Sequence, residues 1–286
     1  MKIFRNLILI LATLFIFELT FTKKAEAAAC TVTSGVYDAS EVTSGFCEAT
    51  PDLYEIVIYQ LYLCTSAPTA PTTTSAVDLE SGGCQLTFNN ASGSTASVSQ
   101  GTTVDLGGSF TRPPNGVYTH GYAKMNNTFG ISASIQLDGN VTGQSSGTGT
   151  YCATVATSVT AGTGSDPSGT SICSSTELTA GKLDETLVSF DSSSFLATGS
   201  ASNINGTSAA ISGYLVDTNE YLATGTGDVD RLQGLVTFAD AVTMTDSVTS
   251  VTMSFNVSAG MSVYPESGTG KIIFGSGPFQ AIISAN

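Results

Sequence analysis

The 286-residue chain has one histidine, no tryptophan, and nine lysine and arginine residues against 23 aspartate and glutamate residues, a net charge of −14. A nucleic-acid-binding surface needs clustered Lys and Arg to displace counterions from phosphates, so we predict no nucleic-acid partner. Anionic membrane surfaces are disfavoured for the same reason. One histidine and six cysteines that we expect to be oxidised exclude an ordinary zinc or copper site. The lack of tryptophan weakens a stacking cleft for sugars.

Charged residues are scarce, at 11% of the chain, whereas hydrophobic residues make up 41%. Excess charge therefore does not make the chain disordered, despite its many serines and threonines. Serine and threonine alternate with apolar residues in short segments that Gly, Asn, Asp and Pro interrupt, which is typical of strands with one solvated face. We predict an all-β fold, a disulfide-stapled antiparallel β-sandwich that forms either one large domain or two consecutive ones.

The N-terminus has the order of a secretory signal peptide. Lys2 and Arg5 precede an apolar block over 7–17, and Ala25-Glu26-Ala27 supplies a small-residue cleavage site. We predict that residues 1–27 are removed and that the rest has no membrane span. The mature chain is then extracellular or on the cell surface, or periplasmic in a Gram-negative bacterium. Two alternatives stay open: an uncleaved anchor, although the block is shorter than the ~20 residues of a spanning helix, and lipidation of Cys30.

Six cysteines lie outside the signal peptide, an even number that argues against lipidation of Cys30, since lipidation would leave one thiol unpaired. The sequence leaves the connectivity open, and we predict that each cysteine pairs with its nearest neighbour in the chain. Each bridge would then stabilise the fold by about 3 kcal/mol in the loop-entropy description. The predicted bridges are Cys30–Cys47, Cys64–Cys84 and Cys152–Cys173.

The longest apolar and aromatic run after the signal peptide covers residues 53–64. Its β-branched and aromatic content predicts the central strand of the sandwich, buried on both faces. A buried helix is the alternative, since Pro51 and Asp52 suit a helix start. Further along, the Gly/Ser-rich stretch 143–150 predicts a flexible boundary between an N-terminal β-sandwich region, 28–142, and a C-terminal one, 151–286.

Pro114-Asn115-Gly116 is a strong turn signal before a strand. Together with Val117 and Tyr118 it resembles the turn-and-tyrosine element of prealbumin-like and adhesin-type β-sandwiches. The resemblance covers only these residues and implies architecture alone.

No combination of residues predicts a catalytic site. His120 lies between Tyr118 and Tyr122, a setting more typical of packing than of a general base. Residues 143–147 match the nucleophile-elbow pattern around Ser145, but the elbow needs a following helix and this tract predicts none. We therefore predict that the protein is not an enzyme and takes no organic cofactor.

Acidic and amide side chains gather in two nearby groups in the C-terminal half. They suggest a calcium site, because calcium binds carboxylate and amide oxygens, and loops at one edge of a sandwich bring such groups together. The alternative is a set of ordinary acidic loops. The candidate ligands are Asp217, Asn219, Glu220, Asp228 and Asp230.

We expect a non-enzymatic structural or adhesive protein, the subunit of a coat, fibre or matrix. The alternative is an extracellular module that binds a glycan or another small ligand, calcium-dependent if the acidic site is real. The expected partners are further copies of the chain, or a glycan or protein of a surface. For self-assembly, the apolar segment 279–284 is the terminal segment suited to complete the sheet of a neighbouring copy.

Overall fold

The computed structural model describes residues 28–285 except 100–105, 192, 203–208 and 249–250, so the predicted signal peptide lies outside the described residues. Within them the chain is almost entirely β-structure, with one short α-helix, α1 (Ala39–Ser44). The strands form mainly antiparallel sheets that pack on one another as in a sandwich, which confirms the predicted all-β fold. Two pairs are parallel: β2 (Val36–Tyr37) with β8 (Ser134–Thr142), and β10 (Thr157–Ala161) with β12 (Leu183–Leu187). Asp38 caps α1 by accepting the backbone N–H of Ser40.

The largest sheet has nine strands. Seven run in spatial order along one path, and two more, β12 (Leu183–Leu187) and β10 (Thr157–Ala161), extend it because β12 pairs with the far half of β7. The seven, in spatial order, are β13 (Thr198–Ser202), β14 (Ala210–Val216), β15 (Arg231–Met244), β7 (Gly116–Ser132), β4 (Leu53–Cys64), β5 (Gln85–Val98) and β6 (Ser109–Phe110).

Strand β4 is the predicted central strand, so the helix alternative for residues 53–64 is wrong. It pairs antiparallel with β5 on one side and β7 on the other. Tyr54, Ile56 and Ile58 are buried, whereas the residues between them are only half-buried. The prediction of burial on both faces is therefore wrong. One face of β4 packs into the core and the other is partly open to solvent.

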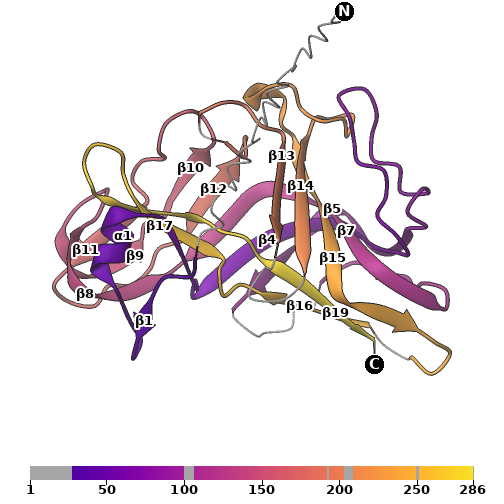
Figure 1. Ribbon diagram of the computed structural model, residues 1–286, viewed down its shortest axis with the longest axis horizontal. Coiled ribbons are helices and arrows are strands. Elements are labelled where there is room, and N and C mark those ends of the chain that lie inside the picture. Colours follow the sequence, from indigo (N-terminus) through magenta and orange to yellow (C-terminus); the bar gives the residue numbers. More distant parts are fainter. Residues whose placement is uncertain (1–27, 100–105, 192, 203–208, 249–250, 286) are drawn as a thin grey trace, which may run out of the picture.

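Three smaller sheets complete the fold. Figure 1 shows β8, β9 and β11 beside α1 at one end of the molecule, with the ends of β7 and β15 at the other. The five-stranded sheet contains β1 (Val32–Thr33), β2 (Val36–Tyr37), β8 (Ser134–Thr142), β9 (Thr148–Thr154) and β11 (Ser171–Ser174). The three-stranded sheet contains β3 (Cys47–Ala49), β17 (Met261–Pro265) and β18 (Ile272–Ser276), and the two-stranded one β16 (Val251–Asn256) and β19 (Gln280–Ala285).

The two-stranded sheet, here called the C-terminal ribbon, packs on the buried face of the large sheet. Phe255 of β16 and Phe279, the residue just before β19, are both buried, and their ring centroids lie 6.1 Å apart. Phe279 also contacts the rings of Tyr54 and Phe129, at 5.6 and 6.2 Å. Residues of all four sheets belong to one hydrophobic core. Of the segment 279–284, predicted as a donor strand, residues 280–284 thus pair with β16 of the same chain here.

The cysteines pair as the nearest-neighbour rule predicts. The bonds are Cys30–Cys47, Cys64–Cys84 and Cys152–Cys173. Cys152 and Cys173 lie opposite each other on β9 and β11, and both are buried. Three bonds of this kind indicate an oxidising compartment. Among the described residues, no helix has the length and hydrophobicity that crossing a membrane requires.

The Gly/Ser-rich stretch 143–150 covers the turn between β8 and β9 and the first three residues of β9, and the two strands pair as an antiparallel hairpin. A Cβ on Gly149 would overlap the carbonyl of Ser174, so this tract packs closely against β11. Strands from both sides of the stretch share sheets: β12 and β15 pair with β7, and β17 pairs with β3. The division into an N-terminal region, 28–142, and a C-terminal region, 151–286, stays a prediction.

The turn before β7 has the tyrosine contact that its sequence suggests. The hydroxyl of Tyr118 donates to the carbonyl of Pro114 at 2.8 Å, four residues upstream. Such a bond from a buried tyrosine back to the preceding turn is the tyrosine corner of sandwich folds. It fixes the start of β7, the strand on which the candidate site below depends.

Candidate functional site: a tyrosine-rich face of the large sheet

The half-open face of the large sheet carries a concentration of tyrosine and amide side chains. Paired residues on neighbouring strands point to the same face. The register places Tyr62 opposite Tyr122 and Gln60 opposite Lys124. Lys124 in turn lies opposite Gln233, which lies opposite Tyr214. Side chains from β4, β7, β15 and β14 therefore meet on one face.

The residues that alternate with these lie on the opposite face. Leu61, Ala123 and Gly234 line an apolar cavity under the C-terminal ribbon. We call the first set, together with its neighbours Tyr59 and Arg231, the tyrosine face. Its members are Tyr59, Gln60, Tyr62, Tyr122, Lys124, Tyr214, Arg231 and Gln233.

A β-bulge widens the tyrosine face at Tyr59. Against β7, Ile58 pairs with Met125 and Gln60 with Lys124, so Tyr59 is an extra residue on β4. Against β5 the register shifts at the same place, but there the extra residues, 90–93, lie on β5. The guanidinium of Arg231 lies over its ring, 4.2 Å from the centroid. Bulges re-aim side chains and are frequent beside functional sites. Here the bulge brings a cation and an aromatic ring to the edge of the amide cluster.

Hydrogen bonds fix the amides and hydroxyls of the face. The Tyr62 hydroxyl donates to Oε1 of Gln60 at 3.0 Å, and Nε2 of Gln60 donates to Oδ1 of Asn89 at 3.0 Å. The Tyr122 ring meets the Tyr62 ring edge-on, with centroids 6.5 Å apart. These rings therefore have one defined orientation, which lowers the entropic cost of binding a partner against them.

Gln233 lies at the base of the face and is only 1% exposed. Its Oε1 accepts the hydroxyl of Tyr122 at 2.5 Å. Its Nε2 has no hydrogen-bond partner, and it alone among the buried side-chain nitrogens and oxygens of the described residues is in this state. An unpaired buried donor costs free energy, and in native structures it calls for a specific explanation.

Glu220 reaches the face from the turn after β14. Both of its carboxylate oxygens accept from Nζ of Lys124, at 2.8 and 2.6 Å. The backbone of Glu220 has a φ of 65°, a left-handed conformation that costs a non-glycine residue free energy. Burial raises the pKa of the Tyr62 and Tyr122 hydroxyls, and the negative charge of Glu220 raises each further. Both tyrosines therefore stay protonated donors.

The predicted calcium ligands do not converge. Glu220 bonds to Lys124, Asp230 pairs with Arg231 at 3.1 Å, and Asp228 accepts the hydroxyl of Thr224 at 2.6 Å. Asp217 accepts the backbone N–H groups of Asn219 and Tyr221, which closes the turn. Over the described ranges, no group of three or more His, Cys, Asp or Glu side chains is placed to hold a metal ion. The geometry adds no support for calcium, and the site stays a prediction.

The two residues weighed for catalysis are not brought together. His120 lies opposite Cys64, and its Nδ1 is 2.8 Å from Oγ1 of Thr119. Partial burial lowers the pKa of His120. Ser145 is exposed, in the turn between β8 and β9, and a strand follows it where a nucleophile elbow needs a helix.

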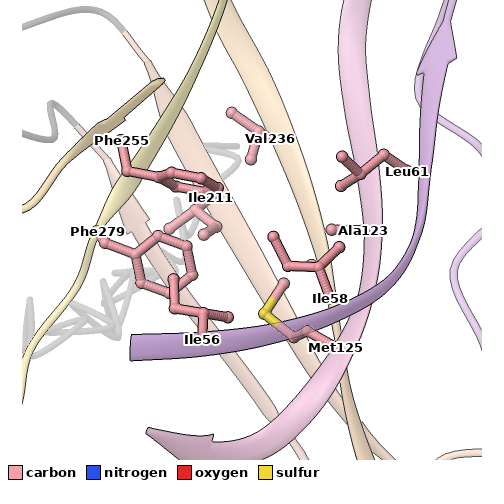
Figure 2. Close-up of a pocket in the computed structure, with 10 residues that line it drawn as sticks. Ile56, Ile58, Leu61, Ala123, Met125, Ile211, Val236, Phe255 and Phe279 are labelled. Atoms are coloured by element: carbon pink, nitrogen blue, oxygen red, sulfur yellow. The ribbon is translucent and has the colours of Figure 1, made fainter. Parts of the chain in front are cut away.

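The cavity under the ribbon has a volume of about 20 Å³, and Figure 2 shows Phe255 and Phe279 on one side of it and Leu61 and Ala123 on the other. An apolar cavity of this size stays dry and offers no group for chemistry. Its lining residues are Ile56, Ile58, Leu61, Ala123, Met125, Ile211, Gly234, Val236, Phe255 and Phe279.

Comparison of the chain with protein-family models, with curated proteins and with solved structures finds no match. Sequence reasoning missed the tyrosine face, although the alternation Gln60-Leu61-Tyr62 and Tyr122-Ala123-Lys124 marks polar and aromatic residues on one side of two strands. What it could not show is that these two strands are neighbours.

Proposed function

We propose that this protein is a secreted or cell-surface β-sandwich protein with a structural or adhesive role and no enzymatic activity. We propose further that the tyrosine face is its contact surface for a polyhydroxylated partner, such as a surface glycan. The observation that carries the proposal is a set of partly exposed side chains from four strands on one face, with Tyr122 and Gln233 buried among them. The exposed members are three tyrosines, one amide and two cations: Tyr59, Tyr62, Tyr214, Gln60, Lys124 and Arg231. Tyrosine and arginine are the residues that most often anchor binding surfaces.

The chemistry of the face suits a glycan. Tyrosine rings offer flat apolar surfaces for the C–H groups of a sugar ring, and their hydroxyls bond to polar groups at the rim. Gln60 and Asn89 add partly exposed amide groups that both donate and accept, which matches sugar hydroxyls. A sheet face is rigid, so little conformational entropy is lost on binding.

An array of neutral and acidic oligosaccharides tests the proposal. We expect the mature protein to bind a subset of them, and Tyr59→Ala and Tyr62→Ala to weaken that binding at least about tenfold, since each removes a ring from the face. Tyr151→Ala is the matched control, because Tyr151 is a half-buried tyrosine of β9 in the five-stranded sheet. Absence of binding, or equal loss in the control, would overturn the assignment of the face.

Light scattering of the mature protein, with and without chelator, tests the structural part. A large species that survives the chelator supports a coat or fibre subunit. A monomer supports an adhesive protein that acts singly through the tyrosine face, and it argues against a coat or fibre. A monomer that loses thermal stability with chelator would contradict the geometry and restore the calcium site.

A further inference from the structure

We infer that Glu220 occupies the place of a ligand carboxylate, and that the tyrosine face takes an acidic saccharide whose carboxylate displaces Glu220 from Lys124. This inference rests on the proposed glycan-binding function and names the class of glycan. It starts from two donors on directly opposed residues of β7 and β15: the ammonium group of Lys124 and the amide of Gln233.

The side chain of Lys124 is largely buried in the tyrosine face, with only 13% of it exposed. A cation this buried needs a negative partner, and both oxygens of Glu220 supply it. The partner, however, comes from a turn and not from the sheet. Glu220 itself is 37% exposed, so its carboxylate can move into solvent without unfolding a strand.

The turn that carries Glu220 is strained. Its hydrogen bonds run from the N–H of Glu220 to the carbonyl of Asp217 and from the N–H of Asp217 to the carbonyl of Tyr221. This geometry places residue 220 at a positive φ, a position that glycine or asparagine normally fills. Strain of this kind persists where the side chain has a specific task. The conformation of Glu220 places its carboxylate on the ammonium group of Lys124.

The internal carboxylate nevertheless leaves the neighbouring donor unused. Nε2 of Gln233 has no partner, although it belongs to a residue 1% exposed and directly opposite Lys124. A ligand carboxylate has two oxygens, so it can accept from Lys124 with one and from Gln233 with the other. Glu220 is tethered to its turn and bonds to Lys124 with both oxygens instead. A free carboxylate thus satisfies a group that the internal one does not.

The surroundings specify a saccharide rather than a simple anion. Tyr62 and Tyr122 lie beside the two donors, and the Tyr59–Arg231 pair lies farther along the same face. Tyr122 is only 1% exposed, so it is the partly exposed rings of Tyr59 and Tyr62 that match the apolar side of a pyranose ring attached to the carboxylate. The ligand class is therefore a uronic acid residue within an oligosaccharide.

The probes are a galacturonic acid trimer and the neutral galactose trimer, with binding measured by calorimetry at 0.15 M salt to screen the acidic protein surface. We expect the wild type to prefer the acidic trimer. Glu220→Gln should raise affinity for the acidic trimer about fivefold to tenfold, because it removes the competing carboxylate, and leave the neutral trimer unchanged. Lys124→Met should abolish the preference.

Two further variants keep the outcome interpretable. Glu220→Gly also removes the carboxylate and relieves the positive φ, so it should act like Glu220→Gln even if one of them folds poorly. Glu55→Gln is the matched control, since Glu55 pairs with Lys182 at 2.9 Å at the far end of β4. It should leave both affinities unchanged.

The inference and the proposed function fail differently. Equal affinity of the wild type for both trimers, unchanged in the Glu220 and Lys124 variants, overturns the acidic-saccharide inference and leaves glycan binding standing. Failure of every variant to bind either trimer, or any other oligosaccharide on the array, overturns both.

Discussion

The carboxylate of Glu185, in β12, accepts the backbone N–H of Ser276, at the end of β18. This bond joins the large sheet to the three-stranded sheet across 91 residues of sequence, and Glu185 is 4% exposed. Burial raises the pKa of this carboxyl group, and the bond to Ser276 opposes the rise. Burial and the nearby Glu185 charge raise the pKa of both Tyr54 and Tyr264. An acidic group therefore lies in the core without a cation.

A raised pKa makes stability depend on pH. The folded state binds the Glu185 proton more tightly than the unfolded state, whose glutamate pKa is about 4.3. The stabilisation that protonation of Glu185 gives the folded state is therefore fully present below pH values near the unfolded-state pKa. It is lost as pH rises through the folded-state pKa. In denaturant titrations we expect the free energy of unfolding of Glu185→Gln, relative to wild type, to increase with pH over this range. Parallel pH curves for the two proteins would contradict the prediction.

The Lys124–Glu220 pair should show measurable coupling. A double-mutant cycle with Lys124→Met and Glu220→Gln is expected to give a coupling free energy of about 1 kcal/mol, since the lysine is mostly buried. The control cycle is Asp230–Arg231, where both side chains are 40% exposed. It should give no more than about 0.5 kcal/mol. Equal coupling in the two cycles would mean that burial of Lys124 adds nothing.

Phe279 should anchor the C-terminal ribbon. Phe279→Ala removes a ring that contacts three other buried rings, so we expect a loss of about 3–5 kcal/mol in the free energy of unfolding. Phe110→Ala is the matched control, because Phe110 is 64% exposed, and it should cost at most about 1 kcal/mol. A small effect at Phe279 would show that the ribbon is not held to the sheet by this residue.

Gly149 should tolerate no side chain. Gly149→Ala places a methyl group against the backbone of Ser174, and we expect a loss of about 3 kcal/mol, measured by thermal or chemical unfolding. Gly227→Ala is the control, since a Cβ there meets nothing within 4 Å. It should change stability by less than about 0.5 kcal/mol. If both variants unfold alike, the start of β9 is not closely packed against β11.

Features that depend on neighbouring residues could be predicted from the sequence. The alternation around Ile56 and Ile58 indicates a strand, because side chains of a strand point alternately to its two faces. Cysteine spacings of 17, 20 and 21 residues favour bridges between chain neighbours, and these are the bridges that form. The turn at Pro114 and the bond from Tyr118 follow from local backbone chemistry.

Features that join segments far apart in the chain could not be predicted from the sequence. Gln60, Lys124 and Gln233 become neighbours only because β4, β7 and β15 pair in this order, and many strand orders satisfy the same alternation. The acidic residues between 217 and 230 could not be placed from the sequence either. They have the composition of a calcium site, but in the fold Glu220 pairs with Lys124 and Asp230 pairs with Arg231. Likewise the stretch 143–150 has the composition of a linker and forms a packed hairpin.

By itself, then, the amino-acid sequence determined the strand content, the disulfide pairing and the acidic, low-charge composition, because each depends on residue type and short spacing. Tertiary structure alone decided which face is open, which donor on that face has no partner, and which acid reaches Lys124. These depend on strand order and register, which are fixed by the packing of the whole core and not by any one segment.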